Sequence, residues 1–403
     1  MAVSAARRAA YEVLLRVFEQ DAYADRVFRT AAGGLDDRER AFAQRLAYGS
    51  VQRVRTLDHA IETLGKRPVR KLDPPVRASL RLGAYQLAYT DTAPHAAANE
   101  SVELVRRARL ERAVPFTNAV MRRLAQGITA LLDSLPEGPL KESYPDWIYE
   151  TFRRDLGLND AIALMRAMNE PLETVVRLVR GEPPGEPTDV PGAYRVQRVD
   201  DLAVADGRIW PQSRGSQLAG LVVGSQDGER VLDLCAAPGG MTAQLRGEVT
   251  AVEIDPNRAS ELRANLAALQ ATHVTVVEAD GTELPPELTG FDRALVDAPC
   301  SGLGVLAQRP DLRWRATPLP ELQLALLRSA AERLKPGGTL VYSVCTINAE
   351  ENEAIVDASG LGVVPLGEEW PQFAHPRRPE FLLTLPHVHG TSGFFVGRLR
   401  VDG

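Results

Sequence analysis

Two cysteines and one aspartate stand where predicted strands end, and their side chains could react together there. Asp297 and Cys300 belong to the phrase DAPCSG, and Cys345 belongs to the phrase YSVCT. A metal site is not expected, because the chain has no Cys-x-x-Cys pair and its six histidines are scattered. Two thiols at adjacent strand ends, facing one crevice, suit nucleophilic chemistry better.

Methyl transfer to carbon 5 of a cytosine is the reaction that needs this set of groups. Carbon 5 is a poor nucleophile until a thiolate adds to carbon 6 and converts the ring to an enamine. Asp297 is the candidate for stabilising that adduct near ring nitrogen 3, and a second acid or base would help to release the product. The base must leave its stack to reach such a site. This chemistry leaves open which of the two thiols attacks.

A glycine-containing turn is the element around which these residues are organised. Residues 231–240 read VLDLCAAPGG, which predicts a strand that feeds a tight turn and then a helical stretch. A nucleotide-like ligand can approach the bare backbone of such a turn. The dinucleotide fingerprint G-x-G-x-x-G is absent, so an NAD site loses its main support. We interpret Cys235 as a turn residue whose backbone touches the ligand.

Acidic residues follow the next strands at regular spacing. Glu253 ends the second strand, roughly 20 residues after the first turn, where a carboxylate can reach ribose hydroxyls. Asp255 competes for that role. Asp280 ends the third strand and could accept a hydrogen bond from an adenine amino group, while Asp297 ends the fourth. An acid at each successive strand end therefore predicts a nucleoside-containing cofactor.

The order of these segments predicts an α/β fold. From residue 230 onward, helical stretches at 256–270 and 318–334 separate the strand-like runs. Such a series indicates a Rossmann-like parallel, doubly wound sheet that binds its ligand at the carboxyl ends of its strands. The runs 361–366 and 393–401 would complete one edge. The predicted strands are VLDLC, TAVEID, HVTVVEAD, RALVDAP and GTLVYSVCT.

Three domains are predicted along the 403 residues. Residues 1–135 have helical periodicity almost throughout and read as an all-α domain of six or seven helices. Residues 127–145 contain Pro136, Gly138, Pro139 and Pro145, so a linker is placed there. Residues 140–228 read as a small α+β subdomain, and residues 229–403 form the predicted catalytic domain.

Charge is distributed unevenly between these parts. Residues 1–130 hold 22 Lys and Arg against 14 Asp and Glu, whereas the remaining residues hold 25 against 39. A basic module joined to an acidic one is compatible with a domain that binds phosphate groups. Solvated helix faces explain the charges equally well. Three cysteines indicate a reducing compartment, and neither a signal peptide nor a membrane span is evident. We therefore expect a cytoplasmic protein.

The basic half resembles a known RNA-binding fold. Residues 80–89 (LRLGAYQLAY), 94–107 (PHAAANESVELVRR) and 116–124 (FTNAVMRRL) are similar to those of the NusB-type helical domain. The resemblance implies that Arg7, Arg8 and nearby basic residues face RNA phosphates, which would supply affinity without sequence choice.

The acidic half resembles the RNA 5-methylcytosine methyltransferases that use S-adenosylmethionine, through LCAAPGG, LVDAPCSGLG, LKPGGTLVYSVCT and AEENEAIV. With the NusB-like domain, the chain resembles the RsmB (Sun/Fmu) subfamily, which modifies small-subunit ribosomal RNA. The resemblance implies that Cys345 is the nucleophile and that Cys300 assists product release. It implies a cofactor site made of Cys235, Ala236, Ala237, Pro238, Gly239, Gly240, Met241, Glu253, Asp280 and Asp297.

Three positions depart from the usual pattern of that family. Met241 stands where lysine commonly follows the paired glycines, Val344 replaces a common threonine, and Ser392 replaces a common aspartate. None of these changes removes a reacting atom, so they bear on affinity or selectivity before activity.

Two other functions are compatible with parts of the pattern. A DNA cytosine methyltransferase would use the Pro-Cys cysteine, Cys300, as its nucleophile. A non-catalytic RNA-binding or antitermination factor could retain a methyltransferase fold, but it would have no use for two exposed thiols. The leading hypothesis is therefore an RNA cytosine-5 methyltransferase that binds RNA, acts as a monomer and needs neither a membrane nor an obligate protein partner.

Overall fold

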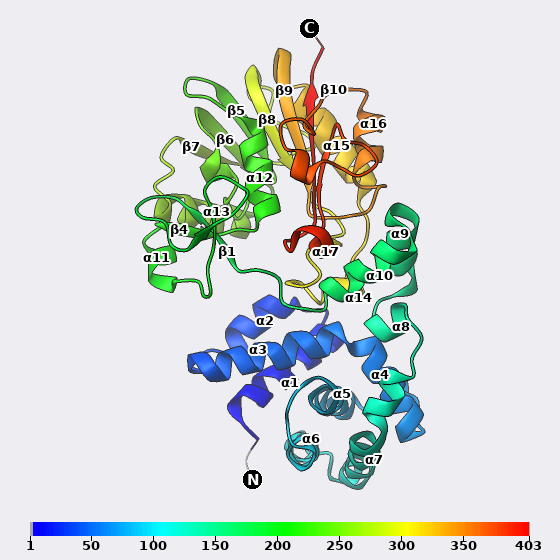
Figure 1. Cartoon of the computed structure of the whole chain (residues 1–403). Helices are drawn as coiled ribbons and strands as arrows, with labels where there is room; N and C mark the ends of the chain where they lie inside the picture. The colour runs from blue at the N-terminus through cyan, green and yellow to red at the C-terminus, as the bar shows by residue number, and fades with distance from the viewer. Residues whose placement is uncertain (1–2, 403) are drawn as a thin grey trace. The chain divides into compact units, whose positions relative to one another are not determined.

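The computed structural model describes residues 3–402 and divides the chain into two compact units (Figure 1). The first unit comprises Met1–Glu170 together with Leu306–Arg315. The second comprises Pro171–Val305 and Ala316–Gly403.

The first unit is helical, as predicted. Asp36 caps α3 by accepting a hydrogen bond from the Glu39 amide at 2.8 Å, and Pro74 begins α5. The main helices are α1 (Ala5–Glu19), α2 (Ala24–Ala31), α3 (Asp37–Gln52), α4 (Val54–Gly65), α5 (Pro74–Tyr89), α6 (Pro94–Arg107), α7 (Val114–Asp133), α8 (Pro139–Glu142), α9 (Asp146–Leu156), α10 (Leu158–Ala167) and α14 (Leu312–Arg315).

Helix α5 is the centre of this unit, because it contacts α1, α3, α4, α6 and α7. Its Leu80 and Leu82 are fully buried, as are Leu46 of α3 and Leu57 of α4. At Gly83 an added Cβ would lie 2.3 Å from the Ser101 hydroxyl, so α6 approaches α5 without room for a side chain.

The helical unit extends beyond the predicted boundary at residue 135. Pro139 does not end the domain but begins α8, and the Thr56 hydroxyl donates to the Leu140 carbonyl at 2.6 Å. Arg55 of α4 pairs with Asp146 of α9 at 2.7 Å. Residues 140–228 are thus divided, with α8–α10 in the first unit and the strands after Glu170 in the second.

A segment from the later part of the chain also belongs to the helical unit. Residues 306–315 follow the DAPCSG phrase and lie outside the predicted strands and helices. Arg313 is fully buried there: its guanidinium donates to the Asn169 side chain at 2.7 Å and the Met168 carbonyl at 2.9 Å, and lies over the Tyr144 ring. The Trp314 indole donates to the Val51 carbonyl at 2.7 Å.

The second unit contains two sheets. The smaller, antiparallel sheet has the order β2-β3-β1-β4. Its strands are β1 (Val175–Leu178), β2 (Glu186–Pro187), β3 (Ala193–Arg195) and β4 (Ile209–Pro211).

The larger sheet has the order β10-β12-β9-β8-β5-β6-β7, and β11 pairs with β12. Strands β9, β8, β5, β6 and β7 are parallel, which confirms the predicted doubly wound α/β core. The tail completes one edge as expected, but β12 inserts antiparallel between β9 and β10. The strands are β5 (Arg230–Leu234), β6 (Glu248–Glu253), β7 (Val274–Glu278), β8 (Phe291–Asp297), β9 (Leu334–Val344), β10 (Gly362–Val364), β11 (Leu382–Thr384) and β12 (Phe394–Arg400).

Helices pack against this sheet and complete its core. Helix α15 contacts β5, β8 and β9, while α12 contacts β8, β9 and β12, and α13 contacts β6 and β7. These helices are α12 (Arg214–Val223), α13 (Pro256–Ala268) and α15 (Pro320–Ala331); α11 (Asp201–Ala205), α16 (Glu353–Ser359) and α17 (Pro386–His389) are shorter. Within residues 3–402, every helix is too short or too polar to cross a membrane.

Replacing Arg313 should destabilise the helical unit. In Arg313→Met the buried carbonyl of Met168 and amide of Asn169 lose their donor, so we expect the free energy of unfolding to fall by about 3 kcal/mol. Urea titration followed by circular dichroism measures this loss. Arg315→Ala on the same helix is the control, since Arg315 pairs with the exposed Asp21 and should cost less than about 1 kcal/mol. An equal fall in the free energy of unfolding for both variants would contradict this stabilising role of the buried Arg313.

Candidate active site

The turn after β5 has the backbone that its sequence predicts. Cys235 and Gly239 both adopt positive φ angles, of 60° and 100°. The Ala236 amide donates to Val252 of β6 at 3.1 Å, which fixes the turn against the neighbouring strand. A cavity of about 160 Å³ borders this turn, lined by Trp210, Pro211, Gln212, Ser216, Asp233, Cys235, Ala236, Ala237, Pro238, Gly240, Met241 and Asp297. Of the predicted turn residues, only Gly239 is absent from the lining.

The small sheet supplies residues to this cavity that the sequence did not indicate. Trp210 and Gln212 lie on or just after β4, and a Cβ on Gly240 would lie 2.5 Å from the Trp210 indole nitrogen. The buried Arg177 of β1 donates to the Gly240 carbonyl at 3.2 Å and to Gln212 at 3.1 Å. Burial lowers the pKa of Arg177 to about 10. No local pattern marks these residues, because only the tertiary contact brings them to the turn.

Two carboxyl groups line the same cavity, that of the buried Asp233 and that of the half-buried Asp297. Burial raises the pKa of Asp233 to about 7, helped by the nearby charge of Asp297 and opposed by a hydrogen bond from Thr242. Burial also raises the pKa of Asp297 to about 6, although the Ser343 hydroxyl donates to it at 2.8 Å. Asp233 Oδ2 has no hydrogen-bond partner among the described residues. An unpartnered buried oxygen beside a cavity is what a missing ligand would leave.

The three remaining acids occupy different surroundings. Glu253 is buried at the end of β6, and its Oε2 accepts no hydrogen bond in residues 3–402 but lies 3.5 Å from the Arg258 guanidinium. Asp255 caps α13 by accepting from the amides of Asn257 and Arg258. Asp280 is exposed, and hydrogen bonds from the Thr282 amide and hydroxyl lower its pKa. Glu253 and Asp280 thus flank the region without lining the 160 Å³ cavity.

Adjacent parallel strands bring two of the three cysteines together. Asp297 of β8 pairs in register with Ser343 of β9, and the chain continues from these strands to Cys300 and Cys345. Their sulfur atoms lie 3.4 Å apart, within hydrogen-bonding distance, and both residues are half-buried. The hydrogen bond with Cys345, followed by burial, raises the pKa of Cys300 well above its usual value. Burial raises the pKa of Cys235 to about 12, so that thiol stays protonated.

The sulfurs therefore meet as the sequence predicts, while the Asp297 carboxyl lies one step back along the strands. Asp297 borders the cavity beside the glycine turn, and that cavity is not lined by Cys300 or Cys345. The same edge of the sheet thus presents a carboxyl group near the turn and a thiol pair beyond it. This arrangement can combine a ligand bound at the turn after β5 with a nucleobase bound at the thiol pair of Cys300 and Cys345.

The departures from the family pattern fall at defined places. Met241 lines the cavity, and Val344 is fully buried in β9, where its side chain belongs to the core. Ser392 is buried, and its carbonyl accepts from the Thr384 hydroxyl at 2.7 Å. The next residue, Gly393, donates to Gly304, whose own amide donates to the Cys345 carbonyl at 3.0 Å. The backbone of Gly393, next to Ser392, is thus joined to Gly304, which in turn contacts the Cys345 carbonyl.

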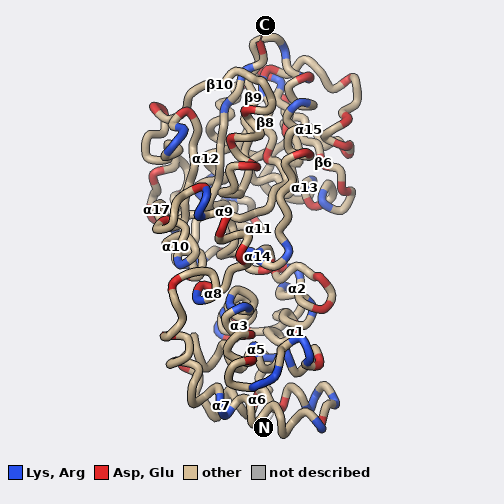
Figure 2. Tube along the Cα trace, turned by 90° about the vertical axis from the view of Figure 1, so that its right-hand side faces the viewer, with Lys and Arg blue, Asp and Glu red and all other residues tan. Residues whose placement is uncertain are grey.

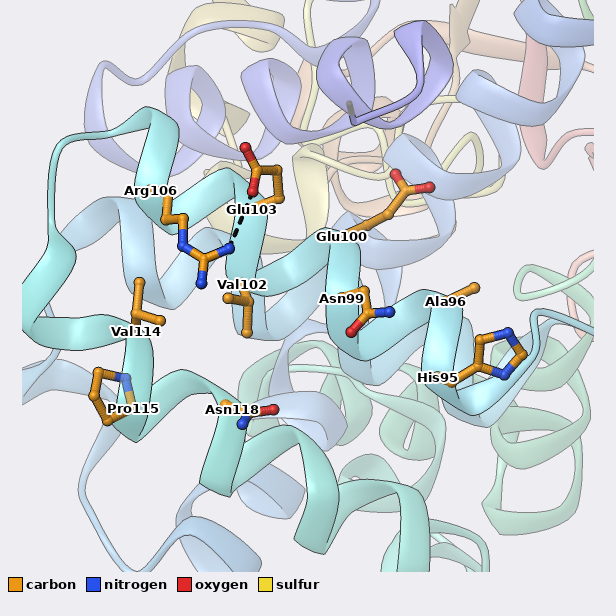
Figure 3. Close-up of a pocket in the computed structure, with 10 residues that line it drawn as sticks. All are labelled: His95, Ala96, Asn99, Glu100, Val102, Glu103, Arg106, Val114, Pro115 and Asn118. Carbon is orange, nitrogen blue, oxygen red and sulfur yellow. Dashed lines mark hydrogen bonds and ion pairs between the residues drawn. The ribbon is translucent and has the colours of Figure 1, made fainter. Parts of the chain in front are cut away.

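A second cavity, of about 840 Å³, lies in the helical unit between α6 and α7 (Figure 3). Its charged side chains are engaged with one another or with α1: Arg106 donates to Glu103, and Glu100 pairs with Arg7. It is lined by no cysteine or aspartate, so it carries none of the predicted chemistry. No group of three metal-ligating side chains occurs in residues 3–402.

Comparison with known proteins identifies the family. A model of the 16S rRNA methyltransferase RsmB/F family matches residues 221–400, and a NusB family model matches residues 4–126. A ribosomal RNA small subunit methyltransferase B from Thermus thermophilus is 36% identical over 80% of this chain and 78% of its own length. The chain belongs to the RsmB/F family of rRNA methyltransferases. The resemblances seen in both halves of the sequence are thus confirmed.

Another relative is similar to this chain in sequence, and two solved structures share its fold. A Synechocystis protein named probable ribosomal RNA small subunit methyltransferase B is 32% identical over 98% of this chain and 99% of its own length. The crystal structure of PH0851 shares the fold over 99% of both chains, with a TM-score of 0.82 at 22% identity. A methyltransferase homologue from Pyrococcus horikoshii aligns with 68% of this chain and 99% of its own, at 27% identity and a TM-score of 0.54.

The buried Asp233 should make stability depend on pH. Its carboxyl stays protonated in the fold up to about pH 7, whereas 3.8 is the value expected in the unfolded chain. Stability is therefore lost as the pH rises from 3.8 towards 7, because only the unfolded state ionises freely. Asp233→Asn removes this penalty, so its gain in unfolding free energy should be larger at pH 8 than at pH 5 by on the order of 2 kcal/mol.

Urea titrations at the two pH values measure this difference. Asp255→Asn is the matched control, because hydrogen bonds from two amides lower the pKa of this exposed helix cap, so it is ionised at both pH values. The effect of Asp255→Asn on the unfolding free energy should be the same at both pH values. If the gain in unfolding free energy of Asp233→Asn does not grow with pH, the raised pKa of Asp233 is contradicted.

Proposed function

We propose that this protein transfers a methyl group from S-adenosylmethionine to carbon 5 of a cytosine in small-subunit ribosomal RNA, through a covalent adduct with Cys345. The observation that carries the proposal is the 3.4 Å contact between the sulfurs of Cys300 and Cys345 at the ends of β8 and β9. Both thiols and the neighbouring carboxyl groups come from one chain, which supports action as a monomer. Membership of the rRNA methyltransferase family supports the substrate class.

The turn after β5 fits S-adenosylmethionine. Gly240 lines the cavity beside this turn, and the unpartnered oxygen of Asp233 in the same cavity offers a hydrogen-bond acceptor. Glu253 would accept from ribose hydroxyls through its Oε2, which lies 3.5 Å from the Arg258 guanidinium, and Asp280 would accept from the adenine amino group. Residues 235–241 and Asp297 would hold the rest of the molecule. When bound, the cofactor supplies a methyl group on a positively charged sulfur.

Cys345 begins the reaction as a thiolate. The contact with Cys300 supports this role, since the raised pKa of Cys300 keeps that thiol protonated and able to donate a hydrogen bond to the Cys345 sulfur. The Cys345 sulfur forms a bond to carbon 6 of the flipped cytosine. Asp297, protonated below about pH 6, donates its proton to ring nitrogen 3 and so neutralises the charge that develops on the ring. Carbon 5 then gains the electron density needed to accept a methyl group.

Cys300 acts in product release. Loss of the carbon-5 proton to solvent restores the ring double bond, and the bond between carbon 6 and the Cys345 sulfur breaks with its electron pair returning to sulfur. The Cys300 thiol gives its proton to the departing sulfur across the 3.4 Å contact. Ring nitrogen 3 returns its proton to Asp297. The two sulfurs thus keep one proton between them, which Cys300 recovers before the next turnover.

The helical unit would bind RNA through exposed basic residues. Arg7 is not one of them, because its guanidinium pairs with Glu100 at 3.2 Å and donates to Gln86 within the unit. Arg8 is exposed, and its guanidinium donates to the Val3 carbonyl at 2.6 Å, so this residue stays a candidate for phosphate contact. Figure 2 shows where Lys and Arg lie along the chain. Further exposed Lys and Arg occur on several elements of the unit, and the segment after α4 places four of them close together in sequence. These are Lys66, Arg67, Arg70 and Lys71, which we propose contact phosphates.

Substitution of the two thiols tests the function. With an rRNA fragment and S-adenosylmethionine, Cys300→Ala should accumulate a protein–RNA adduct that survives denaturing electrophoresis, because the departing sulfur is no longer protonated. Cys345→Ala should form no adduct and lose about 10³-fold or more in methyl transfer. Bisulfite sequencing of the RNA locates any 5-methylcytosine that the unsubstituted protein makes.

The double variant Cys300→Ala/Cys345→Ala is the control, and it should form no adduct. A DNA strand of the same sequence should not be methylated. Full turnover by Cys345→Ala, an adduct that depends on Cys300 instead, or preference for DNA would each reject the proposal.

A further inference from the structure

A fully buried carboxylate links the two thiol-bearing loops. Glu351 has no exposed surface, and no Lys or Arg forms an ion pair with it in residues 3–402. Its Oε1 accepts hydrogen bonds from the amides of Ser301 and Leu319 and from the Gln323 side chain, at 2.9–3.1 Å. Its Oε2 accepts from the hydroxyls of Ser301 and Thr346 and from the Asn348 side chain. The charge is therefore balanced by neutral donors alone.

These donors come from three separate segments of the chain. Ser301 directly follows Cys300, and Thr346 directly follows Cys345, so each thiol has a covalent neighbour bound to the same carboxylate. Gln323 of α15 donates to Glu351 and also to the carbonyl of Pro299, on the other side of Cys300. The two loops are further joined by the Ser301 and Thr346 hydroxyls, 2.8 Å apart.

We propose that Glu351 is a positioning residue that sets the distance between the reactive thiols; this inference rests on the proposed function of Cys300 and Cys345. A buried carboxylate without a cation needs every one of its hydrogen bonds, since each lost donor leaves charge unsolvated. Moving either loop away would break bonds to Glu351 before it changed any other part of the sheet. The carboxylate thus holds the sulfurs at 3.4 Å although it touches neither.

A direct electrostatic effect accompanies this geometric one. The charge of Glu351 raises the pKa of Cys300, as does the adjacent Cys345, while the Gly302 amide lowers it. The same charge raises the pKa of Tyr342, the other ionisable group that faces this cluster from β9. A neutral residue at position 351 would therefore loosen the loops and make the Cys300 thiol easier to ionise.

Phenylarsine oxide tests the sulfur spacing without RNA or cofactor. This reagent bridges two neighbouring thiols: two arsenic–sulfur bonds form, and the arsenic-bound oxygen leaves as water with the two thiol protons. Glu351→Gln keeps the size of the side chain but turns one acceptor oxygen into a donor. We expect its affinity for the reagent to fall about tenfold or more, because a loop must move away from the new amide. Cys300→Ala and Cys345→Ala should abolish bridging.

Glu353→Gln is the matched control. Glu353 is also buried, two residues away, but it pairs with His375 at 2.7 Å and contacts neither thiol loop. Its affinity for the reagent should stay within about twofold of the unsubstituted protein. Methylation should separate the variants in the same way, with kcat reduced for Glu351→Gln at unchanged KM for RNA, and with the alkylation of Cys300 shifted to lower pH.

Unchanged bridging in folded Glu351→Gln would overturn the inference, and so would an equal loss in Glu353→Gln. If Glu351→Gln does not fold, Ser301→Ala replaces it: this variant keeps the amide donor, loses the hydroxyl that joins the two loops, and should weaken bridging about threefold. Unchanged bridging in Ser301→Ala would then reject the inference. Because the assay needs no substrate, its result is independent of whether the protein methylates cytosine.

Discussion

The contact between the sulfurs of Cys300 and Cys345 is the constraint on which the rest of the site depends. It exists because β8 and β9 are adjacent and parallel, with Asp297 in register with Ser343, so both chains leave the sheet at the same level. Cysteines 45 positions apart in sequence can then share a proton. The rest of the second unit positions this edge: β5 and β6 hold the glycine turn beside it, and β12 covers the far side of β9.

Neutral groups donate the hydrogen bonds to Asp233, Asp297 and Glu351, although the charge of Arg258 also lowers the pKa of Asp297. Thr242 hydrogen-bonds to Asp233, and the Ser343 hydroxyl donates to Asp297. Six neutral donors hydrogen-bond to Glu351. Burial raises the pKa of Asp233 to about 7 and that of Asp297 to about 6, while the hydrogen bonds from Thr242 and Ser343 lower these pKa values without cancelling the charge. A lysine in their place would keep Asp297 ionised and unable to give a proton to a base. The choice of neutral partners therefore suits proton transfer at the cost of stability.

The sheet and its strand-end residues could be predicted from sequence because their signals are local. Alternating apolar runs mark β5 to β9, and Asp297, Cys300 and Cys345 follow those runs directly. Arg177 and Trp210 gave no such signal, since they reach the Gly240 turn only through the packing of a second sheet. The end of the helical unit was hidden for a related reason: prolines near residue 139 begin a helix as readily as they end a domain, and only the contacts of α8 with α4 decide which. Arg313 and its segment were likewise indistinguishable from a solvated loop.

Positions that differ from the family pattern show which parts of the site depend on side chains and which on backbone. Ser392 contributes its carbonyl, and the neighbouring Gly393 is joined to Gly304, so a serine there leaves these backbone contacts in place. Val344 faces the core, where any β-branched residue of similar volume packs in β9. Met241 is different, because its side chain lines the cavity beside Asp297 and an apolar residue there removes a cation from the neighbourhood of the two carboxyl groups. With lysine at this position the pKa values of Asp233 and Asp297 would fall, so methionine favours the protonated carboxyl that the proposed chemistry needs.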